Sequence, residues 1–261
     1  MGSLYRSYAI ARNDFELLLR ESLFMIVLVA MPLVVIAFGQ PAYSAVLHQE
    51  GYGSANGAEQ VVPGMALMFV FFMVTFAGLA FFREHMWNTW DRIRALPVRN
   101  HEIMLGKVVP TFVIICVQQT IVFTLGHFLF GLQVRGSVLA LICVDLAFAI
   151  WLVTFILATV TVCRTFQQVL AVSNLGAILL AGLGGALAPV HDLPSWISPL
   201  SPFTPTYWAM RGFNSVLLSG EGLSAVLLPI GVLLAGAAAL VIFVSVRFRL
   251  DTQKSGVLPG L

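Results

Sequence analysis

Residues 137–163 read SVLALICVDLAFAIWLVTFILATVTVC, and the only charged side chain among them is Asp145. An α-helix rises 1.5 Å per residue, so about 20 apolar residues are needed to cross a hydrocarbon core about 30 Å thick. Every backbone N–H and C=O in lipid has to be hydrogen-bonded within the protein, which favours a helix over an open strand. The stretch therefore predicts a membrane-spanning helix.

Five other stretches have the same character. With the first one they give six predicted spans, at residues 22–42, 63–82, 107–131, 137–163, 168–188 and 224–247. The whole chain of 261 residues is 59% hydrophobic and 10% charged, whereas soluble domains carry about 25% charged residues. The sequence predicts an all-α integral membrane protein, with a single transmembrane domain over residues 1–261.

The basic residues predict how the spans are oriented. Lys and Arg are enriched on the cytoplasmic side of membrane proteins. If the six helices alternate in direction, twelve of the fourteen basic residues fall on one side: Arg6, Arg12, Arg20, Arg83, Arg92, Arg94, Arg99, Lys107, Arg164, Arg247, Arg249 and Lys254. The other side receives only Arg135 and Arg211. Both termini are therefore expected in the cytoplasm, with the first span kept as an uncleaved anchor.

Two terminal segments lie outside the spans. In residues 4–20, Leu4, Tyr8, Ala11, Phe15 and Leu18 follow one another at steps of four, three, four and three. This spacing predicts an amphipathic helix in the cytoplasmic membrane interface. Residues 248–261 are expected to form a cytoplasmic tail.

Residues 83–106 form the main charged segment of the chain and read REHMWNTWDRIRALPVRNHEIMLG. A short helix is predicted over residues 86–96, with Trp87 and Trp90 on its apolar side. Pro97 disfavours helical backbone at the preceding residue, and Asn100 is a good N-cap for the next helix. The pattern indicates a shaped docking surface, although a charged loop that merely sets the topology would share this composition.

Residues 189–222 lie on the predicted outer side. Five prolines punctuate the segment and divide it into two short helical pieces, near residues 194–200 and 206–218. Trp196, Tyr207 and Trp208 are typical of the lipid headgroup region. We expect a re-entrant or interfacial helical hairpin here.

The sequence lacks the common motifs of catalysis and metal binding. The string nearest to a phosphate-binding loop, Leu105-Gly106-Lys107-Val108, lacks the first glycine and the hydroxyl residue of that motif. The histidines are scattered, and Cys116, Cys143 and Cys163 all lie in apolar runs with no paired spacing. No catalytic residue, metal site, cofactor or nucleic-acid partner is therefore predicted for this chain.

A few residues inside the spans are polar or small, and these could take part in transport or in helix contacts. Asp145 is an ionisable group in lipid and so a functional hypothesis, but it could equally be a carboxylate paired or hydrated near the outer interface. Gln118 and Gln119 could bind a substrate, although amides more often tie helices together. In the fifth span, Gly182 and Gly185 belong to a small-residue pattern that suits close helix contact, a mobile cavity wall or ordinary packing.

The layout as a whole resembles the permease subunits of ABC-2 type transporters. The resemblance covers essentially the entire chain and rests on the order of its weak motifs. It includes Pro63-Gly64 at the outer start of the second span and Ser201-Pro202-Phe203-Thr204-Pro205 leading to Arg211. The cytoplasmic segment matches the family pattern at Glu84, Thr89, Pro97, Val98, Glu102, Gly106 and Lys107, with Ile93 in place of leucine and Ser201 in place of asparagine in the outer motif.

The resemblance implies a multi-subunit exporter in the plasma membrane of a prokaryote. Two permeases, identical or different, would pair and dock two copies of a separate ATPase subunit that holds ATP and magnesium. The docking and coupling residues it implies are Glu84, Trp87, Trp90, Asp91, Arg92, Arg94, Pro97 and Arg99. Spans one, two and five would border the pathway, and the apolar spans favour a drug, a lipid or a lipid-linked glycan as cargo. The alternatives are a stand-alone secondary transporter that uses Asp145 and a membrane scaffold without transport.

Overall fold

The computed structural model of the chain describes residues 26–49, 51–53, 55–86 and 100–247. Within these ranges the regular elements are all helices and no strand occurs. Six helical stretches are long and apolar enough to cross a membrane: Ile26–Gln49, Ala58–Leu79, Gly106–Phe130, Val138–Val162, Phe166–Leu183 and Leu223–Arg247. The predicted all-α fold with six spans is confirmed. The predicted interfacial helix, the short helix at residues 86–96 and the tail lie, apart from Met86, outside the described residues.

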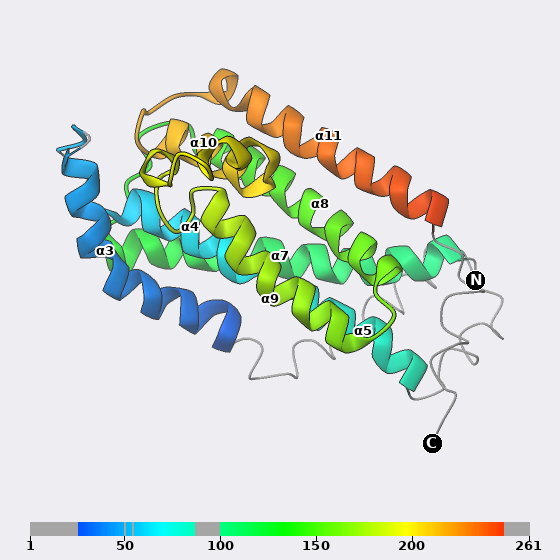
Figure 1. Cartoon of the computed structure of the whole chain (residues 1–261). Coiled ribbons are helices and arrows are strands. Elements are labelled where there is room, and N and C mark those ends of the chain that lie inside the picture. Colours follow the sequence, from blue (N-terminus) through cyan, green and yellow to red (C-terminus); the bar gives the residue numbers. More distant parts are fainter. Residues whose placement is uncertain (1–25, 50, 54, 87–99, 248–261) are drawn as a thin grey trace.

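Figure 1 shows the long helices lying side by side along one common direction. In chain order the elements are η1 (Ile26–Ala30), α3 (Met31–Gln49), α4 (Ala58–Val70), α5 (Met73–Met86), α7 (Asn100–Phe130), α8 (Val138–Val162), α9 (Phe166–Leu183), η2 (Val190–Asp192), η3 (Ser198–Phe203), α10 (Pro205–Leu217) and α11 (Leu223–Arg247). The elements η2, η3 and α10 gather at one end of the bundle, here called the α10 end. The final residues of α5 and α11 lie at the opposite end.

Two spans differ in length from the prediction. The first continues to Gln49, seven residues past the predicted end at residue 42, because Pro41 is accommodated inside α3 and the extension is anchored. Leu47 is buried there, and the Tyr43 hydroxyl donates a hydrogen bond to the carbonyl of Leu187. The fifth span ends at Leu183 instead of residue 188, since the chain turns at Gly185, which has a φ of 84°.

Side-chain caps fix the start of three helices. Ser137 accepts a hydrogen bond from the amide of Ala140 at the start of α8, and Thr165 accepts one from Gln168 at the start of α9. Thr204 caps α10 in the same way, with Pro205 at the first helical position, where its missing N–H is harmless. In these three helices a polar residue thus marks where the helix begins.

The segment between α9 and α11 forms short helices, as the prolines indicate. The second predicted piece, residues 206–218, matches α10 within one residue. The first is a 3-10 helix that begins at Ser198 instead of residue 194. Prolines lack the N–H of a regular ladder, so a short 3-10 helix suits this stretch better than an α-helix.

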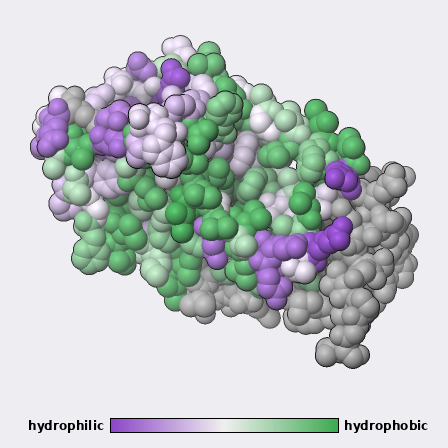
Figure 2. Space-filling view, in the orientation of Figure 1, coloured by the Kyte–Doolittle hydropathy of each residue, from purple (hydrophilic) through white to green (hydrophobic). Residues whose placement is uncertain are grey.

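The helices differ in how many of their residues are buried. Nearly every residue of α4 is buried, and 78% of its span lies inside the bundle, against 17% for the first span and 22% for α9 and α11. Phe71, Phe148 and Phe213 are among the largest fully buried side chains. The face in Figure 2 carries a broad apolar surface between a polar α10 end and a second group of polar residues toward the other end. This pattern matches a bundle with lipid around its middle.

Candidate functional site

The second span is broken in its middle. It consists of α4 and α5, separated by a tightened turn in which the amides of Val74 and Thr75 bond three residues back, to Phe71 and Phe72. The carbonyl of Phe71 also accepts a hydrogen bond of 3.1 Å from the hydroxyl of Ser173 on α9. Ser173 is fully buried. A side chain from a neighbouring helix therefore supports irregular backbone at this depth, as irregular backbone in lipid requires.

The aromatic ring of Phe71 holds the same turn from the other side. It makes edge contacts with Phe148, Trp151 and Phe155 of α8, at centroid distances of 6.0, 6.4 and 6.2 Å. These distances and tilts are in the favourable range for aromatic pairs. The break is thus fixed to α9 through its carbonyl and to α8 through its ring.

The first span is irregular as well. Its sequence contains Pro32, and a proline inside a helix favours a kink. The structure shows a π-helical turn, η1, that ends two residues before Pro32. Because Pro32 has no N–H, the carbonyl of Leu28 loses the donor that a regular α-helix would supply. The side-chain amide of Gln118 on α7 donates to this carbonyl at 3.1 Å, and Gln118 is only 2% exposed.

The two irregular turns lie at the same depth. α3 and α4 run in opposite directions and meet where Gly39 faces Val61. Counting eleven residues from Gly39 to Leu28 and eleven from Val61 to Phe72 advances about 16 Å along each helix. Gln118 is also the midpoint of the Gly106–Phe130 span. The irregular turns of the first two spans therefore form one layer near the middle of the bundle.

Two further polar side chains in the spans have buried atoms without partners. Gln119 is fully buried, and neither its amide oxygen nor its amide nitrogen has a hydrogen-bond partner. The Oδ1 atom of Asp145 on α8 is likewise buried and unpaired. Buried polar atoms of this kind are costly, and each one calls for an explanation.

Close helix contact occurs at other glycines than those predicted. A Cβ atom on Gly182 would meet only Leu187, at 3.8 Å, so this residue packs against nothing tightly within the chain. Gly185 forms the turn after α9. Much tighter approaches occur at Gly184, where a Cβ would lie 2.4 Å from Thr206, and at Gly64, where it would lie 2.2 Å from the carbonyl oxygen of Ala186.

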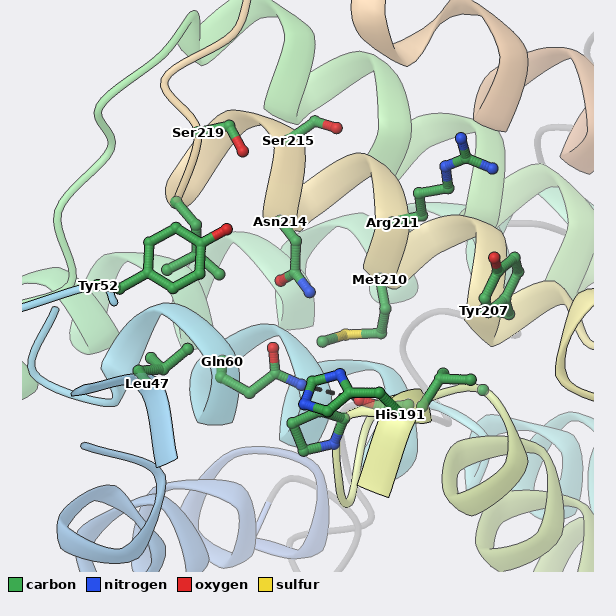
Figure 3. A pocket seen from close by; sticks show the side chains of 15 residues that line it. Leu47, Tyr52, Gln60, His191, Tyr207, Met210, Arg211, Asn214, Ser215 and Ser219 are labelled. Carbon is green, nitrogen blue, oxygen red and sulfur yellow. Dashed lines mark hydrogen bonds between the residues drawn. The ribbon is translucent and has the colours of Figure 1, made fainter. Parts of the chain in front are cut away.

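A cavity of about 320 Å³ lies at the α10 end, between α4, α10 and the turn after α9. Figure 3 shows the side-chain amides of Gln60 and Asn214 pointing toward each other across it. Gln60 is held in place because its amide nitrogen donates to the carbonyl of Gly185 at 2.8 Å. Arg211 lies at the rim over the ring of Trp208, with its guanidinium carbon 5.5 Å from the ring centroid. The size is at the lower limit of ligand pockets, about 300 Å³.

The predicted docking residues are scarcely covered by the structure. Trp87, Trp90, Asp91, Arg92, Arg94, Pro97 and Arg99 lie outside the described residues, and of Glu84 only its place in α5 is given. Conversely, Phe71 and Ser173 were not singled out from the sequence, because a serine among small apolar residues carries no signal of its own. The effect of Pro32 on the carbonyl four residues earlier could have been inferred.

Comparisons with known proteins agree with this architecture. The family model described as ABC-2 type transporter matches residues 5–218. The linearmycin resistance permease protein LnrN of Bacillus subtilis (strain 168) is 28% identical over 190 residues, which cover 73% of this chain and 49% of that protein. The probable multidrug ABC transporter permease YbhR of Escherichia coli (strain K12) is 28% identical over 149 residues, covering 56% of this chain and 40% of that one.

A eukaryotic protein is similar too. ABC transporter G family member 20 of Dictyostelium discoideum is 24% identical over 177 residues, covering 66% of this chain and 24% of its own length. The chain thus spans about half the length of these relatives, or less. The family match extends over most of the chain and includes five of the six spans. The chain is a multi-pass membrane protein and belongs to the ABC-2 type transporter family.

Proposed function

We propose that the chain is the membrane-spanning permease subunit of an ABC exporter and forms the pathway for a hydrophobic or amphipathic cargo, such as a drug, a lipid or a lipid-linked glycan. The family match over residues 5–218 carries this proposal. The printed names of two relatives, a linearmycin resistance permease and a probable multidrug permease, support export of this kind of molecule. ATP and magnesium are bound by a separate ATPase subunit, and hydrolysis takes place there.

The exposed apolar faces support pairing with a second permease, identical or different. On α3, Val34 and Phe38 are 50% and 84% exposed, and on α9, Leu175 and Leu179 are 60% and 56% exposed. Both helices lie next to α4, which is almost wholly buried. In the paired complex, with two ATPase copies, spans one, two and five border the central pathway. Apolar faces also suit lipid, so the pairing itself has to be measured.

The proposed orientation follows from the basic residues. It places both termini in the cytoplasm of a prokaryote, beneath the plasma membrane, and the α10 end on the outer side. Of the basic residues predicted on the outer side, Arg211 lies in α10 and Arg135 lies in the connection between α7 and α8. The end of α5, which leads into the docking segment, then faces the cytoplasm.

Charge reversal in the docking segment tests the proposal. Asp91→Arg together with Arg94→Glu reverses both charges that the ATPase contact would use, while the spans are unchanged. ATP hydrolysis by the complex should become uncoupled from transport, and the variant should reach the membrane in normal amounts. Transport at the wild-type rate in this variant would count against the docking surface.

The second candidate function is a stand-alone secondary transporter that uses Asp145. It is favoured by one observation, the buried and unpaired Oδ1 atom of this carboxyl group inside a span. Loss of uptake or efflux in Asp145→Asn, measured with no ATPase present, would support it. Transport that requires the ATPase and is unaffected by Asp145→Asn would exclude it.

A further inference from the structure

We propose that Gln118 and Ser173 are positioning residues that hold the irregular turns of the first and second spans and thereby transmit movement of the ATPase-docking segments into the pathway. This inference rests on the proposed ABC export function. Both side chains donate to backbone carbonyls of a different span, at 3.1 Å. Neither residue belongs to the docking segment predicted at residues 83–106.

Each turn is a place where a span can bend. π-helical turns within helices are frequent at functional sites, and mid-helix 3-10 turns often mark hinges. η1 is a π-helical turn beside Pro32, and the Phe71–Phe72 turn is bonded three residues back, as in a 3-10 helix. Because the two turns lie at one depth, a bend in one span can be matched by a bend in its neighbour.

The chain connects both turns to the cytoplasmic side. α5 (Met73–Met86) follows the turn at Phe72 and ends within the first residues of the docking segment at 83–106. η1 begins six residues after the predicted interfacial helix of residues 4–20, which the family resemblance also places at the docking surface. Movement of either docking element therefore reaches its span on the cytoplasmic side of the turn. The parts of the two spans beyond the turns, α3 and α4, are the parts that lead to the α10 end.

α9 supports the second span on both sides of its turn. Gly64, Phe71 and Gly78 follow one another at seven-residue steps, so they lie on one face of the span. A Cβ at Gly64 would lie 2.2 Å from Ala186, and one at Gly78 would lie 2.5 Å from Val169. Gly64 lets the turn after α9 lie close to α4, and Gly78 lets α9 itself lie close to α5. Between them, the Ser173 hydroxyl is the polar contact that fixes how α9 is aligned with the turn.

The chain offers a matched control for each residue. Gln119 is a fully buried amide one position from Gln118, but it bonds no backbone group. Ser245 is a serine in a span whose hydroxyl donates to the carbonyl of Val241 in its own helix. Gln119→Leu and Ser245→Ala thus remove the same chemical groups without releasing a neighbouring span.

The experiment measures movement across the turn and needs no identified cargo. Spin labels are placed at Met86→Cys on α5 and Val162→Cys on α8, with Cys116, Cys143 and Cys163 replaced. A second pair at Phe128→Cys and Leu139→Cys, on exposed positions of α7 and α8 near the α10 end, serves as the reference. Distances are measured by pulsed electron resonance on the complex with its ATPase, without nucleotide and after trapping with ATP and vanadate.

The wild-type complex should show a shift of the first distance on trapping. In Gln118→Leu and Ser173→Ala the ratio of shifted to unshifted complexes should fall about threefold, the factor expected from loss of one average hydrogen bond in a membrane protein. The rate of ATP hydrolysis should stay near the wild-type value. The control variants, and Ser173→Thr with its retained hydroxyl, should behave as the wild type does.

The outcomes separate this inference from the proposed function. Absence of vanadate-sensitive hydrolysis in the wild-type complex would contradict the export function itself. Normal hydrolysis with an unchanged distance shift in both variants would overturn the positioning role alone. An equal loss in Gln119→Leu would also overturn it, because loss of a buried amide that holds no neighbouring span would then have the same effect. If Gln118→Leu does not assemble, Gln118→Asn, which keeps the amide but shortens its reach, takes its place.

Discussion

A methyl group added at Gly64 should destabilise the bundle strongly. A Cβ there would lie 2.2 Å from the carbonyl oxygen of Ala186 and 3.3 Å from its Cα, so the new atom meets backbone. Backbone between α9 and η2 cannot rotate away as a flexible side chain can. Overpacking of a buried site costs about 1–3 kcal/mol, and a contact this short belongs at the upper end, about 3 kcal/mol.

Alanine substitutions at two other glycines should destabilise the protein less than Gly64→Ala does. At Gly78 the nearest atom is a side-chain methyl group of Val169, at 2.5 Å, so Gly78→Ala should cost less, about 1–2 kcal/mol. At Gly176, within α9 itself, a Cβ would meet nothing within 4 Å, so Gly176→Ala should be neutral or slightly stabilising.

In the assay, the purified, detergent-solubilised protein is heated to a series of temperatures. The folded fraction that remains is measured by size-exclusion chromatography with fluorescence detection. For a chain of this size about 1 kcal/mol corresponds to roughly 2–4 °C, so Gly64→Ala should lower the unfolding temperature by about 6–12 °C. Gly78→Ala should fall between Gly64→Ala and the wild type. An unfolding temperature for Gly64→Ala equal to that of Gly176→Ala would refute the close approach of α4 to the turn after α9.

Three further predictions concern other parts of the molecule. Phe71→Ala removes a fully buried ring and should cost about 3–5 kcal/mol by the same thermal assay, whereas Phe203→Ala, at a ring that is 88% exposed, should be neutral. Asp145→Asn should leave vanadate-sensitive hydrolysis by the complex unchanged; loss of that activity would give the carboxylate a role in the ATP-driven cycle. A cysteine at Ser195, near the α10 end, should react with a membrane-impermeant maleimide in intact cells, and one at Arg247 should not; the reverse pattern would invert the topology.

The number, type and order of the spans could be predicted from the sequence. Length and hydropathy decide these features, because lipid leaves an apolar stretch few structures besides a helix. The starts of α8 and α9 agree with the prediction within two residues, where Ser137 and Thr165 cap them. The end of the first span was predicted too early, because the helix accommodates Pro41 and continues to Gln49.

The mid-membrane layer could be predicted only in part. Pro32 pointed to an irregular first span, and Gln118 was singled out, but their connection depends on which helices are neighbours. The break at Phe71 has no proline or glycine to mark it. It depends on a hydroxyl group 102 residues later in the chain, on α9. Contacts of this kind come from tertiary packing, which local patterns in one sequence do not reveal.

The glycines show the same limit. Small residues in the fifth span suited close helix contact, a mobile cavity wall or ordinary packing, and their spacing could not say which glycine would contact another helix closely. In the structure that role belongs to Gly184 and to Gly64 on α4, while Gly182 meets only a side chain at 3.8 Å. A helix has several faces, and only the packed bundle decides which one is covered.

The central claim, that this chain is the permease of an ATP-driven exporter, is tested most directly by purifying the tagged chain from its native membrane in gentle detergent. Partners are identified by mass, and the preparation is assayed for vanadate-sensitive ATP hydrolysis. The account predicts recovery of a nucleotide-binding subunit whose hydrolysis depends on this chain, together with one or two kinds of permease. Recovery of the chain without an ATPase and without hydrolysis would contradict it.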